Sequence, residues 1–200
     1  MLEIWLIRHG ETDWNAEDRI LALRDMPLSE RGLVQAAHLR QRFERDGTNF
    51  DAVYASDLGR ARTTAELALP GHAVRTDPRL RELDYGVFEG HRWSDLGGAL
   101  ADQARHWRAE PYGRRAPDGE SYDDVIARFA AFAASLPRSG RFAAFSHGGT
   151  IRCVLYGLMG RPARGVWGLD IANTGITRLR YGERRVTIVS LNDHAHLRDP

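Results

Sequence analysis

Segments with the apolar pattern of β-strands alternate with segments of helical periodicity along most of the chain. The strand-like runs cover residues 2–7, 50–56 and 141–146, and the helix-like runs cover residues 29–47, 57–69, 121–136 and 149–160. Such alternation is typical of an α/β protein with a mainly parallel sheet, and 200 residues suffice for one domain with a sizeable core. We therefore predict a single domain over residues 1–200, folded as a three-layer α/β/α sandwich.

Three further segments complete the expected fold. Residues 175–191 have the pattern of two strands joined by a turn, which predicts a C-terminal hairpin. Residues 92–120 combine short helical patterns with a stretch rich in glycine and proline, and we expect a small helical and loop cap there. The polar end of the chain carries His194 and His196, and we expect it to be disordered rather than a metal site.

Several helix boundaries are marked by residues that cap helices. Ser29 and Gly47 flank the first long helical pattern as an N-cap and a terminator. Ser121 followed by Asp124 has the spacing of a capping box, and Ser56 is the candidate N-cap of the helix at 57–69.

The composition restricts the chemistry and the partners. All 28 basic residues are arginines, so lysine Schiff bases and the phosphate loop with its lysine are excluded, and any phosphate must be bound by arginine. The net charge of +1 does not favour a nucleic-acid or membrane surface. One cysteine, Cys153, excludes an internal disulfide, and no secretory signal or membrane span is present, so we expect a cytoplasmic protein.

Charged and polar residues follow three of the strand-like runs at the point where each ends. Arg8, His9 and Gly10 end the first run, Arg60 follows the second, and His147 with two glycines follows the run at 141–146. Because ligands bind at the carboxyl ends of strands in such sheets, we expect these residues to meet. Two histidines, two arginines and the start of a helix predict a pocket for a phosphate dianion.

Four of these segments resemble the signature blocks of the histidine phosphatase superfamily, also called the phosphoglycerate mutase-like family. The blocks are LIRHGETDWN, SDLGRARTTAE, LRELDYGVFEG and SHGGTIR, and PDGESYDDV and NTGITRLRY also look like segments of this family. The resemblance covers residues 2–191 in the correct order, and it implies the phosphoglycerate mutase-like fold.

The resemblance implies roles for the residues at the strand ends. His9 would be the nucleophile that forms a phosphohistidine, with its other ring nitrogen bound to a backbone carbonyl. Arg8, Arg60 and His147 would bind the phosphoryl oxygens, so that no metal and no cofactor is needed. Asn15 and the amide of Gly148 would add hydrogen bonds.

Glu82 is the candidate proton donor for the leaving alkoxide. The residues around Glu82, taken alone, favour a carboxylate on the surface that pairs with Arg79 or Arg81. The resemblance favours a catalytic role instead, and it favours Glu82 over Asp84.

The family contains both hydrolases and mutases. The mutases that this chain resembles have a longer insertion with an adjacent arginine pair for the substrate carboxylate, whereas here Arg108 is followed by alanine. Arg108 is a candidate substrate-binding residue of the cap, and Arg114 and Arg115 are alternative candidates there. We therefore expect a hydrolase of small phosphorylated metabolites, with a cofactor-dependent phosphoglycerate mutase as the alternative.

Leu21 and Ala22 replace a Gln-Gly or Thr-Gly pair that the family often carries in its substrate loop. Their apolar side chains predict the loss of a polar contact to the substrate and a broader or less polar specificity. A third reading is a binding protein for a phosphorylated ligand without catalysis. The C-terminal hairpin is a candidate surface for pairing in a homodimer.

Overall fold

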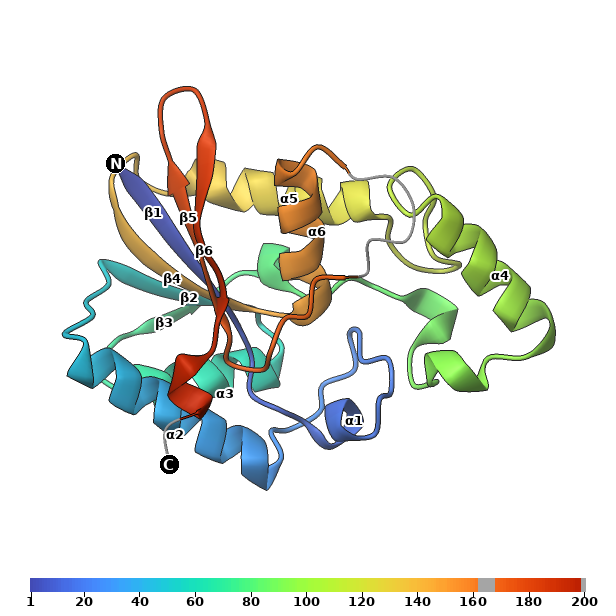
Figure 1. Ribbon diagram of the computed structural model, residues 1–200, viewed down its shortest axis with the longest axis horizontal. Helices are drawn as coiled ribbons and strands as arrows, with labels where there is room; N and C mark the ends of the chain where they lie inside the picture. The colour runs from blue at the N-terminus through green and yellow to red at the C-terminus, as the bar shows by residue number, and fades with distance from the viewer. Residues whose placement is uncertain (162–167, 199–200) are drawn as a thin grey trace.

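A six-stranded sheet with the strand order β3–β2–β4–β1–β5–β6 forms the centre of the molecule (Figure 1). The computed structural model describes residues 1–161 and 168–198. The strands are β1 (Leu2–Arg8), β2 (Ala52–Ala55), β3 (Val74–Thr76), β4 (Gly140–Ser146), β5 (Ile176–Tyr181) and β6 (Val186–Asp193). The pairs β3–β2, β2–β4 and β4–β1 are parallel, and β5 and β6 add an antiparallel hairpin to β1. The predicted mainly parallel sheet and C-terminal hairpin are confirmed.

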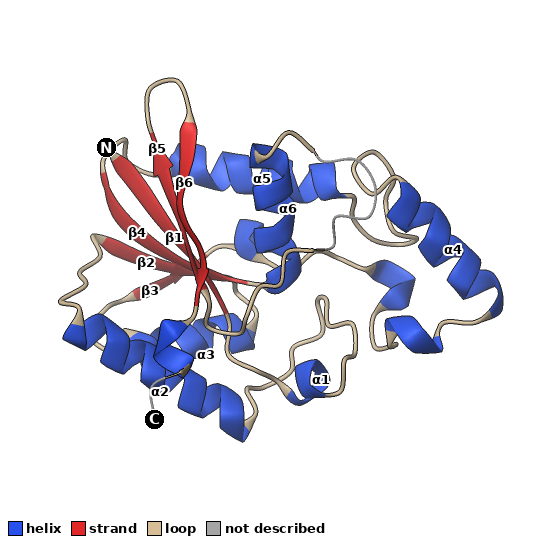
Figure 2. Cartoon of the chain, viewed as in Figure 1, coloured by secondary structure: helices blue, strands red, loops and turns tan. Residues whose placement is uncertain are grey.

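Helices cover both faces of the sheet, which gives the predicted three layers (Figure 2). Helices α2 (Glu30–Arg45) and α3 (Gly59–Ala68) lie on one face, and α5 (Tyr122–Ser135) and α6 (Gly148–Leu158) lie on the other. Strand β1 contributes Trp5 and Ile7 to the core on the α2–α3 side, and Ile4 and Leu6 to the core on the opposite side. Burial on both faces explains why β1 is an almost continuous apolar run.

The expected cap forms a third packed cluster beside the sheet. Within residues 92–120 it contains the short 3-10 helix η3 (Trp93–Asp95) and α4 (Gly98–Ala109), and the 3-10 helix η2 (Gly86–Phe88), which precedes the expected bounds, packs into the same cluster. Trp107 of α4 is 1% exposed and stacks on Trp93, with ring centroids 6.0 Å apart. Trp107 therefore packs the cap. Two more 3-10 turns, η1 (Pro78–Leu80) and η4 (Ala195–Leu197), and the short helix α1 (Asp13–Ala16) complete the described elements.

The helix caps are confirmed except for one. Ser29 accepts the N–H of Gly32 at the start of α2, and Ser121 and Asp124 form the predicted capping box of α5. Ser56 does not cap α3, because that helix begins only at Gly59 and the Ser56 hydroxyl accepts the N–H of Leu58 in the preceding loop.

The expectation of a disordered C-terminal tail is wrong for the residues that the structure describes. Strand β6 reaches Asp193, and η4 packs against α2. His196 is 4% exposed, and its Nε2 lies 2.9 Å from the hydroxyl of Thr174. Across residues 1–161 and 168–198, none of the helices has the length and apolar character that a bilayer span requires.

Candidate active site

The three polar strand ends come together, as the sequence predicts. Strands β1 and β4 are parallel, and the N–H of His9 donates to the carbonyl of Ser146 at 3.0 Å. His147 directly follows Ser146, and the centroids of the His9 and His147 imidazole rings lie 5.0 Å apart. Arg60, in the first turn of α3, is 1% exposed, and its charge acts on both imidazoles. The residues therefore share one buried site.

The imidazole of His9 is held in one tautomer. Its Nδ1 lies 2.6 Å from the carbonyl oxygen of Gly10, so the proton resides on Nδ1 and the lone pair of Nε2 is left for another partner. Burial, together with the charges of Arg60 and Arg8, lowers the pKa of His9 well below 6.5. At neutral pH the ring is therefore uncharged, which is the form that a nucleophile requires.

Gly10 makes this geometry sterically possible. A Cβ atom at this position would lie 2.6 Å from the carbonyl oxygen of Gly32 in α2. Its N–H donates to the hydroxyl of Thr64 on α3 at 3.0 Å. The peptide that holds His9 is thus fixed between two helices, and a larger residue would displace it.

Four buried side-chain nitrogens at this site have no hydrogen-bond partner among the described residues. They are Nε of Arg8, Nε of Arg60, and Nδ1 and Nε2 of His147. Burial lowers the pKa of Arg60 to about 10, so its guanidinium remains charged at neutral pH. Buried polar groups without partners are rare in proteins, and a cluster of them marks the place of a ligand. Two guanidinium groups and an imidazole fit a tetrahedral oxyanion.

Both arginines are fixed in position by backbone carbonyls. Nη1 of Arg8 donates to Ile171 at 2.6 Å. Nη2 and Nη1 of Arg60 donate to Ala22 at 2.6 Å and to Arg24 at 2.8 Å. The loop that carries Ala22 is therefore attached directly to a candidate phosphate ligand.

Glu82 lies at the N-terminus of α6 and is 7% exposed. Its carboxylate accepts the N–H groups of Gly149 at 3.0 Å and of Thr150 at 2.8 Å. The sequence predicts that this helix start offers its N–H groups to a dianion, but two of them are bound by Glu82. The site is thus a carboxylate and an anion pocket that share one helix terminus.

The alternative expectation, in which Glu82 lies on the surface and pairs with Arg79 or Arg81, is wrong. The two arginines that were its candidate partners bind other carboxylates: Arg79 pairs with Asp77, and Arg81 pairs with Asp57 at 2.5 Å. Arg128 of α5 donates to the backbone carbonyl of Glu82 at 3.0 Å, which fixes the segment from the opposite side.

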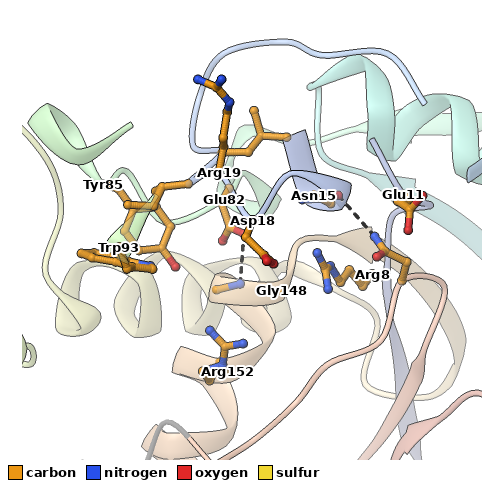
Figure 3. A pocket seen from close by; sticks show the side chains of 14 residues that line it. Arg8, Glu11, Asn15, Asp18, Arg19, Glu82, Tyr85, Trp93, Gly148 and Arg152 are labelled. Atoms are coloured by element: carbon orange, nitrogen blue, oxygen red, sulfur yellow. Dashed lines mark hydrogen bonds between the residues drawn. The ribbon is translucent and has the colours of Figure 1, made fainter. Parts of the chain in front are cut away.

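A cavity of about 330 Å³ is lined by two of these residues, Arg8 and Glu82 (Figure 3). It is lined by Arg8, Glu11, Asn15, Asp18, Arg19, Ile20, Leu21, Glu82, Tyr85, Trp93, Gly148, Gly149, Arg152 and Asn173. Figure 3 shows Arg8 and Asn15 on one side of the view, Tyr85 and Trp93 on the other, and Arg152 extending from α6 between them. Trp93 therefore both packs the cap and lines the cavity.

The remaining residues predicted to bind substrate differ in where they lie. Asn15 lines the cavity, and because its Oδ1 accepts the N–H of Thr12, its Nδ2 is the group that can donate to a phosphoryl oxygen. Leu21 and Gly148 also line the cavity. Ala22 is fully buried: its side chain packs in the apolar cluster of the cap, and its backbone bonds to Glu89 and Arg60.

The prediction that Arg108 binds substrate is not met by its position. Its guanidinium lies over the ring of Trp93, 5.1 Å from the centroid, and Arg108 is not among the residues that line the cavity. The indole attracts the cation, so the guanidinium of Arg108 contacts a ring of the cap instead of lining the cavity.

Several lining residues were not predicted. Asn173 donates to the carbonyl of His9 at 3.0 Å and to Asn15 at 3.4 Å, and the NTG segment was its only sequence signal. Arg152 and Tyr85 lie within the family-like SHGGTIR and LRELDYGVFEG segments, but no role was predicted for them, and Arg19 lies in none of these segments. The described part of the chain contains no group of three His, Cys, Asp or Glu side chains placed to hold a metal ion.

Comparison with known proteins agrees with this geometry. The family model described as histidine phosphatase superfamily (branch 1) matches residues 4–194. A probable phosphoglycerate mutase GpmB of Yersinia pestis (strain Pestoides F) is 37% identical over 214 aligned positions, covering 100% of this chain and 97% of its own length.

Two solved structures are similar over nearly the whole chain. Phosphoserine phosphatase of Entamoeba histolytica, in complex with 3-phosphoglyceric acid, has a TM-score of 0.86 at 27% identity and covers 98% of this chain and 100% of its own. Alpha-ribazole phosphatase of Shigella flexneri has a TM-score of 0.80 at 28% identity, with 96% of each chain covered. With the family match over residues 4–194, this chain belongs to the histidine phosphatase superfamily, branch 1.

Proposed function

We propose that this protein is a metal-independent hydrolase of small phosphomonoesters that acts through a phosphohistidine on His9. The observation that carries the proposal is the neutral imidazole of His9, with Nδ1 bound to Gly10, beside buried nitrogens of Arg8, Arg60 and His147 that have no partner within residues 1–161 and 168–198. This set combines a nucleophile with preorganised donors for a phosphoryl group.

In the first step, Nε2 of His9 attacks phosphorus, the N–P bond forms, and the bond from phosphorus to the ester oxygen breaks. Arg8 and Arg60 stabilise the negative charge on the three equatorial oxygens, and they do so without reorganisation because backbone carbonyls hold them. A proton from the carboxyl of Glu82 passes to the leaving oxygen.

In the second step, water attacks the phosphohistidine. The Glu82 carboxylate accepts a proton from this water, the N–P bond breaks, and inorganic phosphate leaves with the site restored. The contact of Glu82 with the N–H groups of Gly149 and Thr150 orients the carboxylate for both proton transfers. The substrate is a phosphorylated metabolite, and we place the reaction in the cytoplasm.

Hydrolysis is favoured over mutase activity by the arrangement of the cap arginines. Arg108 lies over Trp93, Arg114 pairs with Glu110, and Arg115 pairs with Asp124. Among the described residues that line the cavity, these three arginines do not occur. A carboxylate site made by the cap, as expected for a phosphoglycerate mutase, therefore has no support here.

Phosphoglycerate mutase remains the second candidate because curated relatives at 37% identity carry that name. One experiment separates the two. Purified protein is incubated with phosphomonoesters in EDTA, and inorganic phosphate is measured. The panel includes 3-phosphoglycerate with and without 2,3-bisphosphoglycerate, and the 2-phosphoglycerate isomer is assayed as well.

A hydrolase releases phosphate in EDTA, forms an alkali-stable phosphoenzyme on His9, and loses both with His9→Ala. The control is His91→Ala, since His91 is an exposed histidine outside the cavity. Isomerisation that requires the bisphosphate and releases no phosphate would instead establish a mutase. Phosphate binding by a folded protein without turnover would favour the non-catalytic reading.

A further inference from the structure

The candidate proton donor Glu82 lies on a segment without regular secondary structure. Helix η1 ends at Leu80 and η2 begins at Gly86, so the backbone of residues 81–85 belongs to neither helix nor strand. A buried polar backbone group that lacks a hydrogen bond is costly, so such a segment needs partners from elsewhere in the fold. These partners decide how firmly the carboxyl of Glu82 is held.

Two hydroxyl groups bind the start of this segment. The hydroxyl of Ser146, at the end of β4, donates to the carbonyl of Leu80 at 2.8 Å. The hydroxyl of Thr150, in the first turn of α6, donates to the carbonyl of Arg81 at 2.6 Å. The segment is therefore joined to the strand and the helix that flank His147.

Arg128 of α5 binds the same segment from the other side. Its Nη1 donates to the carbonyl of Arg79 at 2.7 Å, and its Nη2 donates to the carbonyl of Glu82 at 3.0 Å. One planar guanidinium thus spans the turn between these two residues. Helix α5 packs against α6, whose N-terminal N–H groups bind the carboxylate of Glu82. Arg128 holds the backbone of Glu82 while α6 holds its side chain.

Glu120 fixes Arg128 in turn. Its Oε1 accepts the Nε–H of Arg128 at 3.0 Å, and its Oε2 accepts an N–H of Nη2 at 3.2 Å. Oε2 also accepts the N–H of Asp84 at 3.0 Å, and the N–H of Glu120 donates to the carbonyl of Asp84 at 2.9 Å. The side chains of Arg128 and Glu120 are only 16% and 27% exposed, which limits the screening of this pair by water. The pair therefore binds the backbone at Glu82 and two residues beyond it.

We propose that Arg128 is a positioning residue for proton transfer: by holding the carbonyl of Glu82, it places the carboxyl of Glu82 within reach of the leaving oxygen. A displacement of about 1 Å is enough to cost about 100-fold in rate. Among the described residues that line the cavity, Arg128 does not occur, so it acts through Glu82 and not on the substrate. The inference rests on the proposed function, because it explains how the proton donor of that reaction is held.

The test compares two leaving groups. An alkyl phosphate needs a proton on its leaving oxygen, whereas p-nitrophenyl phosphate releases a stable anion. The value of kcat/KM reports the steps up to departure of the leaving group, so it isolates this proton transfer. In Arg128→Gln, kcat/KM should fall by about 10- to 100-fold for the alkyl phosphate that the wild type cleaves best, and by no more than about 3-fold for p-nitrophenyl phosphate.

The two esters also separate this role from an effect through His147. Burial is the main cause of the lowered pKa of His147, and the charge of Arg128 contributes to it. A change at His147 would alter the binding of the phosphoryl group, which both esters share, and would lower both rates alike. Equal losses on the two esters, or unchanged rates on both, would overturn the proposal.

Two further variants complete the comparison. Arg128→Lys keeps the charge but not the planar fork, so it should recover part of the loss on the alkyl phosphate. Arg42→Gln is the matched control, because the side chain of Arg42 is 18% exposed and also pairs with carboxylates, those of Asp46 and Asp193. It should change the ratio of the two kcat/KM values by no more than about 2-fold.

Glu120→Gln keeps the proposal testable if Arg128→Gln does not fold. Its amide still offers an oxygen to the N–H of Asp84, but it binds the guanidinium less strongly than a carboxylate does. We expect kcat/KM for the alkyl phosphate to fall by about 3- to 10-fold, with p-nitrophenyl phosphate nearly unaffected. A loss of the same size on both esters would count against the proposal.

Amide hydrogen exchange separates this inference from the phosphatase activity. In Arg128→Gln, the N–H groups of Gly149 and Thr150 should exchange about 10-fold faster or more, because the carboxylate that they bind is no longer held. The N–H of Ser56, which is bound to the carbonyl of Phe145, is the reference for global opening. Wild-type exchange at both positions would overturn the role of Arg128 even if hydrolysis is found. Faster exchange would support it even if the wild type releases no phosphate, in which case the proposed function fails by itself.

Discussion

Glu82 and Gly149 are in direct contact across 67 residues of sequence: the carboxylate of Glu82 accepts the N–H of Gly149 at 3.0 Å. A Cβ atom at position 149 would lie 2.5 Å from Oε1 of Glu82 and 2.7 Å from the hydroxyl of Tyr85. The second glycine of the SHGGT segment therefore provides the space in which the candidate proton donor lies.

Replacement of this glycine should displace the proton donor. We expect Gly149→Ala to lower kcat by about 10- to 100-fold on esters with a poor leaving group, because their alkoxide needs a proton. The effect on p-nitrophenyl phosphate should be smaller, since its leaving group is stable as an anion. The measurement is the ratio of kcat values on the two kinds of ester.

A matched glycine provides the control. No atom lies within 4 Å of the position where a Cβ of Gly71 would be, so Gly71→Ala should keep both rates within about 2-fold. Full activity of Gly149→Ala on poor leaving groups would show that the position of Glu82 does not matter for the reaction.

The pH dependence of activity should lack the titration of an ordinary histidine. Burial and two arginine charges lower the pKa of His9 well below 6.5, and burial does the same for His147. The nucleophile is the neutral form, so activity should persist as the pH falls through 6.5 and decline only at lower pH. We would measure kcat/KM between about pH 5 and pH 8.

The ester itself titrates near pH 6, which is about the second pKa of a phosphate group, so its ionisation is measured separately by phosphorus NMR and divided out. A remaining acid limb centred near the usual pKa of histidine would mean that His9 is solvated in the free enzyme.

The roles of Leu21 and Ala22 in the substrate loop can be tested with separate variants. Leu21 lines the cavity with its side chain, whereas Ala22 contributes its carbonyl to Arg60 and its N–H to Glu89. We expect Leu21→Gln to favour polar esters over apolar ones by about 3- to 10-fold, because the amide supplies a hydrogen bond. Ala22→Gly should change the rates on all esters by the same factor.

A panel of polar and apolar phosphomonoesters, ranked by kcat/KM, gives the readout. An unchanged ranking in the double variant Leu21→Gln, Ala22→Gly would remove the idea that this pair sets substrate polarity.

The sequence predicted the parts of the site that depend on local order. Arg8, His9 and His147 directly follow or end strands, and parallel strands of one sheet place their carboxyl ends together. The capping serine Ser121 depends on residues three positions away, and it too was predictable. These features follow from backbone geometry alone.

The remaining parts depend on contacts between distant segments. Glu82 is one of several acidic residues beside arginines, and its burial follows from the approach of α6, which no neighbouring residue indicates. Arg152 lies within the family-like SHGGTIR segment, but its place in the wall of the cavity depends on how α6 packs, which that segment does not show. Ser56 failed as a cap because the loop before α3 runs two residues further than the local pattern suggested.

The C-terminal residues give the last prediction. His196 contacts the hydroxyl of Thr174, and Thr174 in turn donates its N–H to the carbonyl of Arg8 at 3.0 Å. The pKa of His196 is lowered from 6.5 to about 4, mainly by burial; the charges of Arg42, His194 and His38 contribute to the lowering, and Asp193 opposes it. The folded state therefore favours the neutral imidazole.

The sign of the pH effect follows from this shift. Above pH 6.5 the imidazole is neutral in both the folded and the unfolded chain, so its contribution to stability is fully present. As the pH falls from 6.5 toward about 4, the unfolded chain binds a proton that the folded chain does not, and stability decreases.

In His196→Asn, whose amide does not titrate, the free energy of unfolding should fall less over this range. Urea denaturation of both proteins at several pH values measures the difference, with His91→Asn as the exposed control. Parallel pH curves for the wild type and His196→Asn would mean that His196 is protonated with an ordinary pKa in the folded protein, and that the C-terminal turn does not bury it in solution.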